Sequence, residues 1–460
     1  MSPGRTPASA APAPFEVKER VVSREEHGIS RKNISPNALR VLYRLKDAGY
    51  DAYLVGGAVR DLLLGGHPKD FDVATNATPE QVKQQFRNCR LIGRRFRLAH
   101  VMFGGEVIEV ATFRASDDDG SGARHVVDGR IVRDNVYGTI QEDAIRRDFT
   151  VNALYYAIED FSVRDFLGGY EDVEHRVLRL IGDAEQRYRE DPVRMLRAIR
   201  LAAKLGFTIE ESAYVAIRKL APLIAEAAPA RLFDELLKLF LSGHAVESFR
   251  GLLESGLLKE FLPQTARALV THAKGSGGVL IDAALANTDE RLAQDKPVSP
   301  AFLLAALLWP AARKRYETLA AEGLDPSIAW LRASNHVIAE QVQRMALPRR
   351  FTAPMQEIWA MQARFPSAQK KRATRLMAHP RFRAAYDFFL LRALEEPELE
   401  AAAQWWRERV EQPHEAQREA PAAGSSAAAP ADGVARKRKR RRRRKPGSAG
   451  AGDAAPPPEA

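Results

Sequence analysis

The feature that most constrains the fold is a change in hydrophobic periodicity near residue 185. Before it, short apolar runs such as AYLVG and FDVAT alternate with Gly-rich turns and helical segments, which predicts strands mixed with helices. After it, apolar residues recur at helical spacing to about residue 410, as in RLFDELLKLFLSG and FRAAYDFFLLRALEE. We therefore expect an α+β protein, with a small mixed-sheet domain followed by an all-α neck and body.

The same patterns divide the 460 residues, too many for one hydrophobic core, into segments. The N-terminus is rich in Pro and Ala and lacks the apolar core of a secretory signal, so we expect a disordered leader. Beyond about residue 410 the composition shifts to Ala, Pro, Gly and Ser, which predicts a disordered tail. The predicted segments are the leader (1–30), the mixed α/β domain (31–180), the helical neck (181–250), the helical body (251–410) and the basic tail (411–460).

Positive charge is concentrated in that tail. The formal net charge is +11, and residues 436–445 (RKRKRRRRRK) are ten consecutive cations, so the rest of the chain is nearly neutral. Such a run repels itself and stays extended until a polyanion neutralises it. It is either a solubilising tail or a sequence-independent grip on RNA that works through counterion release.

Cysteine content and hydropathy exclude several classes of protein. The single cysteine, Cys89, excludes a disulfide framework and a multi-cysteine zinc site, and it fits a reducing compartment. No apolar run is long enough to cross a bilayer. We therefore expect a cytoplasmic protein.

The segment LVGGAVRDLLLGGHPKDFDVAT contains the strongest chemical signal. Side chains alternate faces along a strand, so Asp70 and Asp72 should project on the same side while Phe71 turns into the core. Two neighbouring carboxylates repel each other, and a hard cation such as Mg²⁺ relieves this repulsion. A two-metal site would activate an attacking 3′ hydroxyl and stabilise a leaving pyrophosphate.

A Gly-Gly pair precedes this acidic pair and predicts an anion site. Gly56 and Gly57 end a strand and begin a helix, where free backbone N–H groups suit a triphosphate. Arg60 lies one helical turn further on and adds positive charge. Alone, the glycines would indicate only a tight turn, and Arg60 only a salt bridge with Asp61.

A third carboxylate would complete the metal site, and two residues are candidates. Glu109 interrupts an apolar strand, VIEVATFR, where a buried charge is costly. Asp148 lies in RRDFTVNA, where an ion-paired helix start is the other interpretation. Their spacing does not choose between them.

Three blocks, in this order, resemble a known family: the Gly-Gly/Arg-Asp/Asp-x-Asp block, RRDFTVNA and EDPVRMLRAIR. They resemble the class II nucleotidyltransferases of the polymerase-β superfamily, which include bacterial poly(A) polymerases and CCA-adding tRNA enzymes. The resemblance extends from about residue 34 to about residue 410. It implies a catalytic domain at 31–180, a base-recognising neck and an RNA-binding body.

The resemblance also implies roles for individual residues. Asp70 and Asp72 would bind the catalytic metals, and Asp148 would be catalytic, beside Glu109, which geometry suggests. ATP would be the nucleotide substrate. The nucleotide-binding residues implied by the blocks are Gly56, Gly57, Arg60, Asp61, Arg147, Asn152, Asp191, Arg194 and Arg197.

The neck should choose the base. Arg194, Arg197, Arg200 and Lys204 recur at helical spacing and form a basic stripe, which is most often a solvated face. The resemblance implies instead that Asp191 and Arg194 read the base. A carboxylate accepts from the adenine amino group and a guanidinium donates to a ring nitrogen. Cytosine presents the same order, so this pair does not separate poly(A) synthesis from CCA addition.

Three stretches of the sequence, together with the basic tail, favour poly(A) addition to RNA 3′ ends over CCA addition. Two upstream stretches and HPRFRAAYDFFLLRA resemble bacterial poly(A) polymerases, and the oligo-Arg tail suits heterogeneous RNA. A catalytically inactive RNA-binding scaffold is a third reading, which loss of either Asp would have favoured. RNA-decay proteins are candidate partners, and the oligomeric state stays open. The RNA-binding residues we predict are Arg94, Arg95, Arg436, Lys437, Arg438, Lys439, Arg440 and Arg441.

Overall fold

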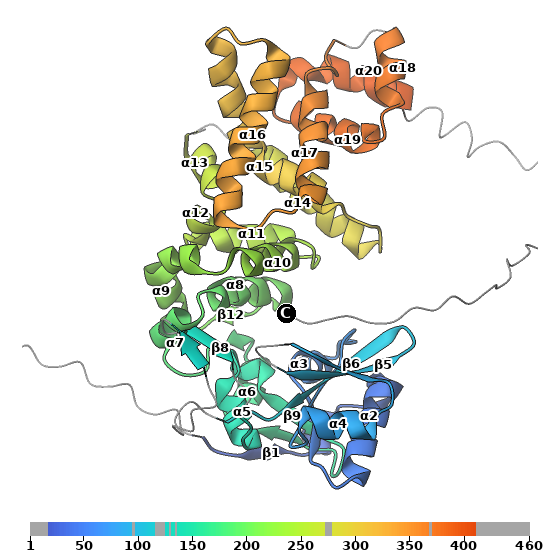
Figure 1. The fold of residues 1–460 in the computed structure, drawn as a ribbon, viewed down its shortest axis with the longest axis vertical. Helices are drawn as coiled ribbons and strands as arrows, with labels where there is room; N and C mark the ends of the chain where they lie inside the picture. The colour runs from blue at the N-terminus through green and yellow to red at the C-terminus, as the bar shows by residue number, and fades with distance from the viewer. Residues whose placement is uncertain are drawn as a thin grey trace, which may run out of the picture. The chain divides into compact units, whose positions relative to one another are not determined.

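The computed structural model describes residues 17–93, 97–115, 125–127, 130–133, 136–271, 278–367 and 370–410. Residues up to Trp405 form one compact unit, and those from Trp406 belong to a second. The predicted α+β class is confirmed, since strands and helices mix in the first part of the chain and helices dominate the rest (Figure 1). No helix in the described part of the chain is both long and apolar enough to span a bilayer.

The first part is built on an eight-stranded sheet with the order β1-β10-β9-β2-β3-β6-β5-β4. All neighbours are antiparallel except β3 and β6, which run parallel. The strands are β1 (Arg20–Val22), β2 (Ala52–Val55), β3 (Asp72–Thr75), β4 (Cys89–Ile92), β5 (Leu98–Phe103), β6 (Glu106–Thr112), β9 (Leu154–Ala157) and β10 (Val163–Asp165). A separate hairpin pairs β7 (His125–Val127) with β8 (Arg130–Arg133).

Helices cover the two faces of this sheet differently. Helices α2 (Pro36–Asp47) and α4 (Pro79–Gln85) pack on one face, where Val73 is buried (Figure 1). The other face carries Val55, Ala74 and Tyr155, packed with α5 (Ile140–Arg146). The remaining short helices here are α1 (Arg24–His27), η1 (Arg31–Asn33), α3 (Gly57–Leu63), η2 (Thr150–Asn152) and α6 (Gly169–Glu174).

Local signals explain several helix starts. Ser35 caps α2 by accepting hydrogen bonds from the backbone of Asn37 and Ala38, with Pro36 at the first helical position. Thr78 and Gln81 form the capping box expected before α4. Each helix therefore begins where its sequence satisfies the first free N–H groups.

Our prediction of a disordered leader over residues 1–30 is wrong for its C-terminal part. Strand β1 pairs antiparallel with β10, and α1 follows it directly. Val22 is fully buried, and His27 Nε2 lies 2.8 Å from the Phe161 carbonyl oxygen. A strand of three residues is too short to produce a detectable alternating pattern. Residues 1–16 lie outside the described part.

The rest of the described chain is helical apart from β12 (Thr208–Ile209), which pairs in parallel with β11 (Val177–Leu178) and so joins the two parts. Helix α15 (Pro300–Ala321) contains Trp309, which stacks on Trp330 of α16 (Pro326–Arg344) at 5.1 Å between ring centroids. The helices are α7 (Ala184–Glu190), α8 (Val193–Leu205), α9 (Glu211–Leu220), η3 (Ala221–Glu226), α10 (Pro229–Phe240), α11 (Ala245–Glu254), α12 (Leu257–Phe261), α13 (Pro263–Thr271), α14 (Gly278–Ala293), α15 (Pro300–Ala321), α16 (Pro326–Arg344), α17 (Arg349–Gln362), α18 (Lys370–Met377), α19 (Phe382–Ala393), η4 (Pro397–Leu399) and α20 (Glu400–Val410).

Candidate active site

The Asp-x-Asp pair lies at the start of β3. Asp72 is the first residue of the strand and Asp70 precedes it, and both are exposed. Phe71 between them is only 6% exposed and joins the core under α2 and α4. Asp72 alternates with Val73, so its side chain belongs to the opposite face, which it shares with Ala74.

The register of the parallel pair places Glu109 beside Asp72, because these two residues are direct partners between β3 and β6. Desolvation, followed by the negative charges of Glu109 and Asp70, raises the pKa of Asp72 to about 6. On β5, His100 is the cross-strand partner of Glu109, and its Nε2 lies 3.3 Å from Glu109 Oε1. Three carboxylates therefore gather at one end of β3, with a histidine at the edge of the group.

Cationic and polar groups surround the Gly56-Gly57 turn next to this acidic group. Gly56 has a φ of 77°, which favours glycine, and a Cβ there would lie 3.7 Å from Arg147 Nη1. A Cβ on Gly57 would lie 3.3 Å from Arg60 Nη2. The positive charge of Arg147 also lowers the pKa of Asp72, partly opposing the carboxylates. The acidic and cationic groups thus form one site.

Arg60 and Arg147 are held by neighbouring side chains. Arg60 is 3% exposed, donates to Asp61 Oδ1 at 2.9 and 2.6 Å, and also donates to Asn152 Oδ1. The Arg60–Asp61 salt bridge therefore exists together with the contact to the RRDFTVNA block. Arg147 Nη2 lies 2.9 Å from Asp143 Oδ2, and its Nε donates to the Tyr155 hydroxyl at 2.9 Å.

Asp148 lies apart from the three carboxylates, in an ion-pair cluster. It accepts from Arg194 Nε at 2.8 Å and is paired with Arg197, both on α8. Burial raises the pKa of Asp148, but Arg197 and Arg194 outweigh this effect, so its pKa lies below the ordinary value. Of the two candidates for the third carboxylate, the structure places Glu109, and not Asp148, beside Asp72.

The basic stripe of α8 faces acidic side chains over most of its length. Beyond the pairs with Asp148, Arg200 is paired with the buried Glu235 of α10, and Lys204 Nζ lies 3.9 Å from Asp61. Asp191, which precedes the helix, is held by Arg231 through two bonds of 2.9 and 2.7 Å. The stripe is therefore mainly an ion-paired surface between elements that are distant in sequence.

The sequence analysis missed several residues of this site, and two of them could have been found from the sequence. Once the Gly104-Gly105 turn is recognised, the hairpin register pairs His100 with Glu109. Asp143 lies one helical turn before its partner Arg147, a spacing at which side chains of a helix meet. Tyr155 and Arg231 had no such signal, because each acts through a partner farther along the chain. The predicted RNA-binding residues Arg94, Arg95, Arg436, Lys437, Arg438, Lys439, Arg440 and Arg441 lie outside the described residues.

No group of three or more His, Cys, Asp or Glu residues in the described part of the chain is close enough to hold a metal ion by itself. The donor set nevertheless fits Mg²⁺, which binds through one or two carboxylates together with substrate phosphates. Asp70 and Asp72 would supply the carboxylates. Desolvation and the negative charges of Glu109 and Asp70 raise the pKa of Asp72, and a bound cation would oppose this effect.

The site combines carboxylates that suit a hard cation with a glycine turn that is flanked by arginines. This combination suits the transfer of a nucleotidyl group. Family models support this class: the poly A polymerase head domain matches residues 52–179, a probable RNA and SrmB-binding site of polymerase A matches 206–269, and the arginine-rich C-terminus of polymerase A matches 322–445. The chain is a nucleotidyltransferase.

Similar proteins narrow the class to one family. Poly(A) polymerase I of Salmonella typhi is 50% identical over 395 residues, covering 84% of this chain and 85% of that protein. A CCA-adding enzyme of Geobacillus stearothermophilus is 39% identical over 50% of this chain and 55% of its own length. The crystal structure of the Bacillus stearothermophilus CCA-adding enzyme in complex with CTP has a TM-score of 0.54 at 29% identity, covering 82% of each chain. This chain belongs to the poly(A) polymerase family.

Proposed function

We propose that the chain adds AMP units from ATP to RNA 3′ ends without a template and releases pyrophosphate. The observation that carries this proposal is the position of Asp72, beside Glu109 and within the electrostatic influence of Arg147 at the Gly56-Gly57 turn. A nucleoside triphosphate bound at the turn would present its phosphates between the carboxylates and the cations. The scaffold alternative has no support of this kind, because the acidic pair is intact.

Asp70 and Asp72 would hold the catalytic Mg²⁺, with Glu109 as the adjacent third carboxylate. The metal supplies charge stabilisation at the transferred phosphoryl group and lowers the pKa of the attacking 3′ hydroxyl. Arg147 and Arg60 bind the phosphates, and their fixed partners hold both guanidinium groups in place before the substrate arrives. Asn152 holds Arg60 in this arrangement.

The neck would select adenine. Asp191 accepts from the adenine amino group and Arg194 donates to a ring nitrogen. Among the described residues, Arg194 donates through Nε and Nη1, which leaves its Nη2 donors for the base. Arg231 positions the Asp191 carboxylate, and Asp148 positions Arg194 and Arg197.

The substrates also bear on where the chain acts and with which partners. ATP and RNA 3′ ends are cytoplasmic in bacteria, so we place the reaction there. RNA-decay proteins are the partners that this product would bring near the enzyme.

A nucleotide-choice assay tests the function. The pure full-length protein is given each NTP with Mg²⁺, first with an unstructured RNA and then with a tRNA lacking its CCA end. We expect long A-tails on the unstructured RNA and little use of CTP, GTP or UTP. Incorporation of CTP confined to the tRNA would instead support a CCA-adding enzyme, and no incorporation at all would support the scaffold.

A further inference from the structure

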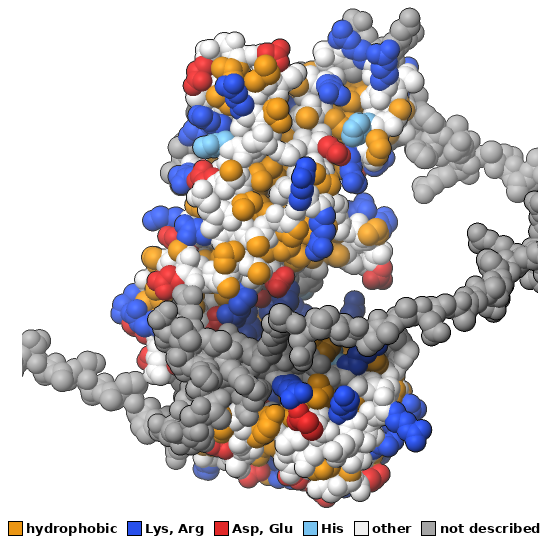
Figure 2. Space-filling model, viewed as in Figure 1, with side chains coloured by type: hydrophobic (Ala, Val, Ile, Leu, Met, Phe, Trp, Pro, Cys, Tyr) orange, Lys and Arg blue, Asp and Glu red, His pale blue; other side chains and the backbone are white. Residues whose placement is uncertain are grey.

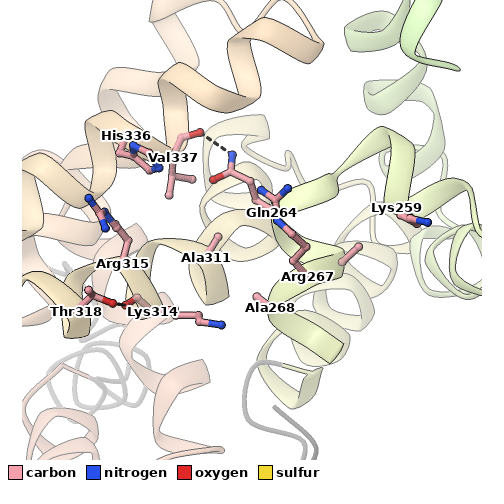
Figure 3. Close-up of a pocket in the computed structure, with 11 residues that line it drawn as sticks. Lys259, Gln264, Arg267, Ala268, Ala311, Lys314, Arg315, Thr318, His336 and Val337 are labelled. Carbon is pink, nitrogen blue, oxygen red and sulfur yellow. Dashed lines mark hydrogen bonds between the residues drawn. The ribbon is translucent and has the colours of Figure 1, made fainter. Parts of the chain in front are cut away.

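A cavity of about 640 Å³ lies in the helical body, away from the candidate active site, among α12, α13, α15 and α16. We call it the body cavity. Figure 3 shows Arg315 and His336 on one side and Gln264 and Arg267 on the other. Among the described residues that line it, the charged and titratable ones are Lys259, Arg267, Lys314, Arg315 and His336, and none of these is a carboxylate.

Two of these cations have no acidic partner in the described part of the chain. Arg315 Nε is buried without any hydrogen-bond acceptor. Lys259 is exposed and takes part in no ion pair there. Arg267, by contrast, is paired with Glu340, which also lies 3.8 Å from His336. A buried donor without an acceptor costs free energy, so Arg315 is poised for an anion that enters the cavity.

Buried polar contacts fix the walls of the body cavity. Gln264 Nε2 on α13 donates to the Val337 carbonyl oxygen of α16 at 2.9 Å, and Thr265 Oγ1 donates to the Leu307 carbonyl oxygen of α15 at 2.6 Å (Figure 3 shows the first). Tyr316 and Trp330 stack at 4.2 Å between ring centroids and join α15 to α16. The cations are therefore presented by a preorganised frame, which lowers the ordering cost of binding.

The lining also has an apolar part, made by Ala266, Ala268, Ala311 and Val337. A nucleotide matches this combination, because its phosphate meets the cations while its base and sugar lie against the apolar wall. Figure 2 shows Lys and Arg side chains distributed among exposed apolar side chains over the helical part of the chain. The match to a probable RNA-binding model, residues 206–269, ends inside the cavity wall and includes Lys259 and Gln264.

We propose that the body cavity binds phosphates of single-stranded RNA upstream of the 3′ end, as a second RNA contact separate from the catalytic carboxylates. Lys259 and Arg315 provide the principal positive charge for the phosphates. The neighbouring lining residues Arg267, Lys314 and His336 lie beside them. This inference rests on RNA being the substrate, as proposed above. It adds that RNA long enough to reach the cavity binds more tightly than RNA that fills only the 3′ end site.

The test uses the full-length chain with Lys259→Gln and Arg315→Gln together. The matched control is Lys296→Gln with Arg332→Gln, which removes two exposed cations that do not line the cavity and lie outside residues 206–269. Fluorescence anisotropy measures the affinity for a long unstructured RNA (about 30 nucleotides) and a short one (about 6) at 50 and 200 mM salt. Thermal unfolding verifies that both variants keep the wild-type stability.

We expect the cavity variant to lose affinity for the long RNA alone. Two lost phosphate contacts should reduce the slope of log affinity against log salt concentration by about 1.4. The ratio of wild-type to variant affinity should therefore fall about sevenfold between 50 and 200 mM salt. The control should keep the wild-type slope. An unchanged slope, as expected if a protein segment occupies the cavity, overturns the proposal, and so does an equal loss for the short RNA.

A second readout separates this inference from the proposed function. Addition of AMP to saturating short RNA should proceed at the wild-type rate in the cavity variant. If the wild-type protein adds no AMP, the proposed function fails while the affinity measurements still judge the cavity. If the cavity variant binds the long RNA as the wild type does, the cavity proposal fails while polyadenylation is untouched.

Discussion

At the scale of single residues, the position of Asp72 in the candidate active site lowers the stability of the fold. Desolvation, Glu109 and Asp70 raise its pKa from 3.8 to about 6. The folded chain therefore binds this proton more tightly than the unfolded chain does. It follows that ionised Asp72 opposes folding above about pH 6, and that this effect disappears as the pH falls toward 4.

We therefore predict that Asp72→Asn abolishes AMP addition and yet raises the free energy of unfolding at pH 8 in EDTA. The gain should be on the order of 1 kcal/mol, because solvent screens an exposed carboxylate. Urea unfolding at pH 8 and at lower pH measures it, and the difference from the wild type should narrow toward pH 4. A variant that is less stable than the wild type at pH 8 would contradict the repulsion among the carboxylates.

Removal of metal gives a second prediction at these residues. Mg²⁺ at about 100 times its dissociation constant should stabilise the wild-type fold by about 2.7 kcal/mol relative to EDTA. Asp70→Asn with Asp72→Asn should lose this response, while Asp47→Asn, at an exposed carboxylate of α2, should keep it. Thermal unfolding with and without Mg²⁺ measures the effect. Equal responses in all three proteins would rule out binding at the pair.

Local spacing predicted part of this site and distant pairing decided the rest. The i, i+2 rule assumed that Asp70 and Asp72 share a strand, whereas β3 begins at Asp72 and Asp70 lies before it. The two residues are nevertheless close enough for the charge of Asp70 to raise the pKa of Asp72. The choice between Glu109 and Asp148 depended on the parallel register of β3 with β6, and nothing within either segment specifies that register. The spacing of residues in the sequence left that choice open, because strand pairing in the tertiary structure determines which carboxylate lies beside Asp72.

At the scale of elements, the start of α8 is joined to the sheet domain through one carboxylate. The Asp148 carboxylate forms ion pairs with Arg194 and Arg197 on one face of the helix. In addition, Arg187 of α7 donates hydrogen bonds to the backbone oxygens of Arg146 and Arg147. The helix itself was predictable from its periodicity. Its acidic partners were not predictable, because Asp148 lies 46 residues from Arg194 and Glu235 lies 35 residues from Arg200.

We predict that Asp148→Asn destabilises the fold by about 3 kcal/mol, because it leaves two arginines without their buried partner. Glu357→Gln, which breaks an exposed pair with Arg381, should cost less than about 1 kcal/mol. Denaturant unfolding of both variants gives the comparison. If the two variants lose the same small amount, Asp148 does not fix the position of α8.

At the scale of the whole molecule, the longest run of positive charge lies outside the part of the chain that the structure describes. In the described part of the chain, arginines such as Arg194, Arg200 and Arg231 are held in ion pairs with carboxylates of the same fold. Ten consecutive cations lie between Arg436 and Lys445, outside the described residues. Composition alone predicted this division. It did not predict the body cavity, because four helices that are separate in sequence bring its cations together.

Two separate cationic regions should act additively on RNA. Deletion of residues 411–460 removes the run of ten cations and should reduce the salt slope of RNA binding by up to about 7, at little cost to the rate on saturating RNA. The double substitution Lys259→Gln with Arg315→Gln should lower the salt slope by its own, smaller amount. This decrease should be the same in the truncated chain and in the full-length chain, because sites that share no partner contribute independently. The four proteins form a double-mutant cycle, measured by anisotropy at several salt concentrations. If the cavity substitutions have no effect once the tail is gone, the tail and the cavity hold the same phosphates, and the body cavity is not a separate RNA contact.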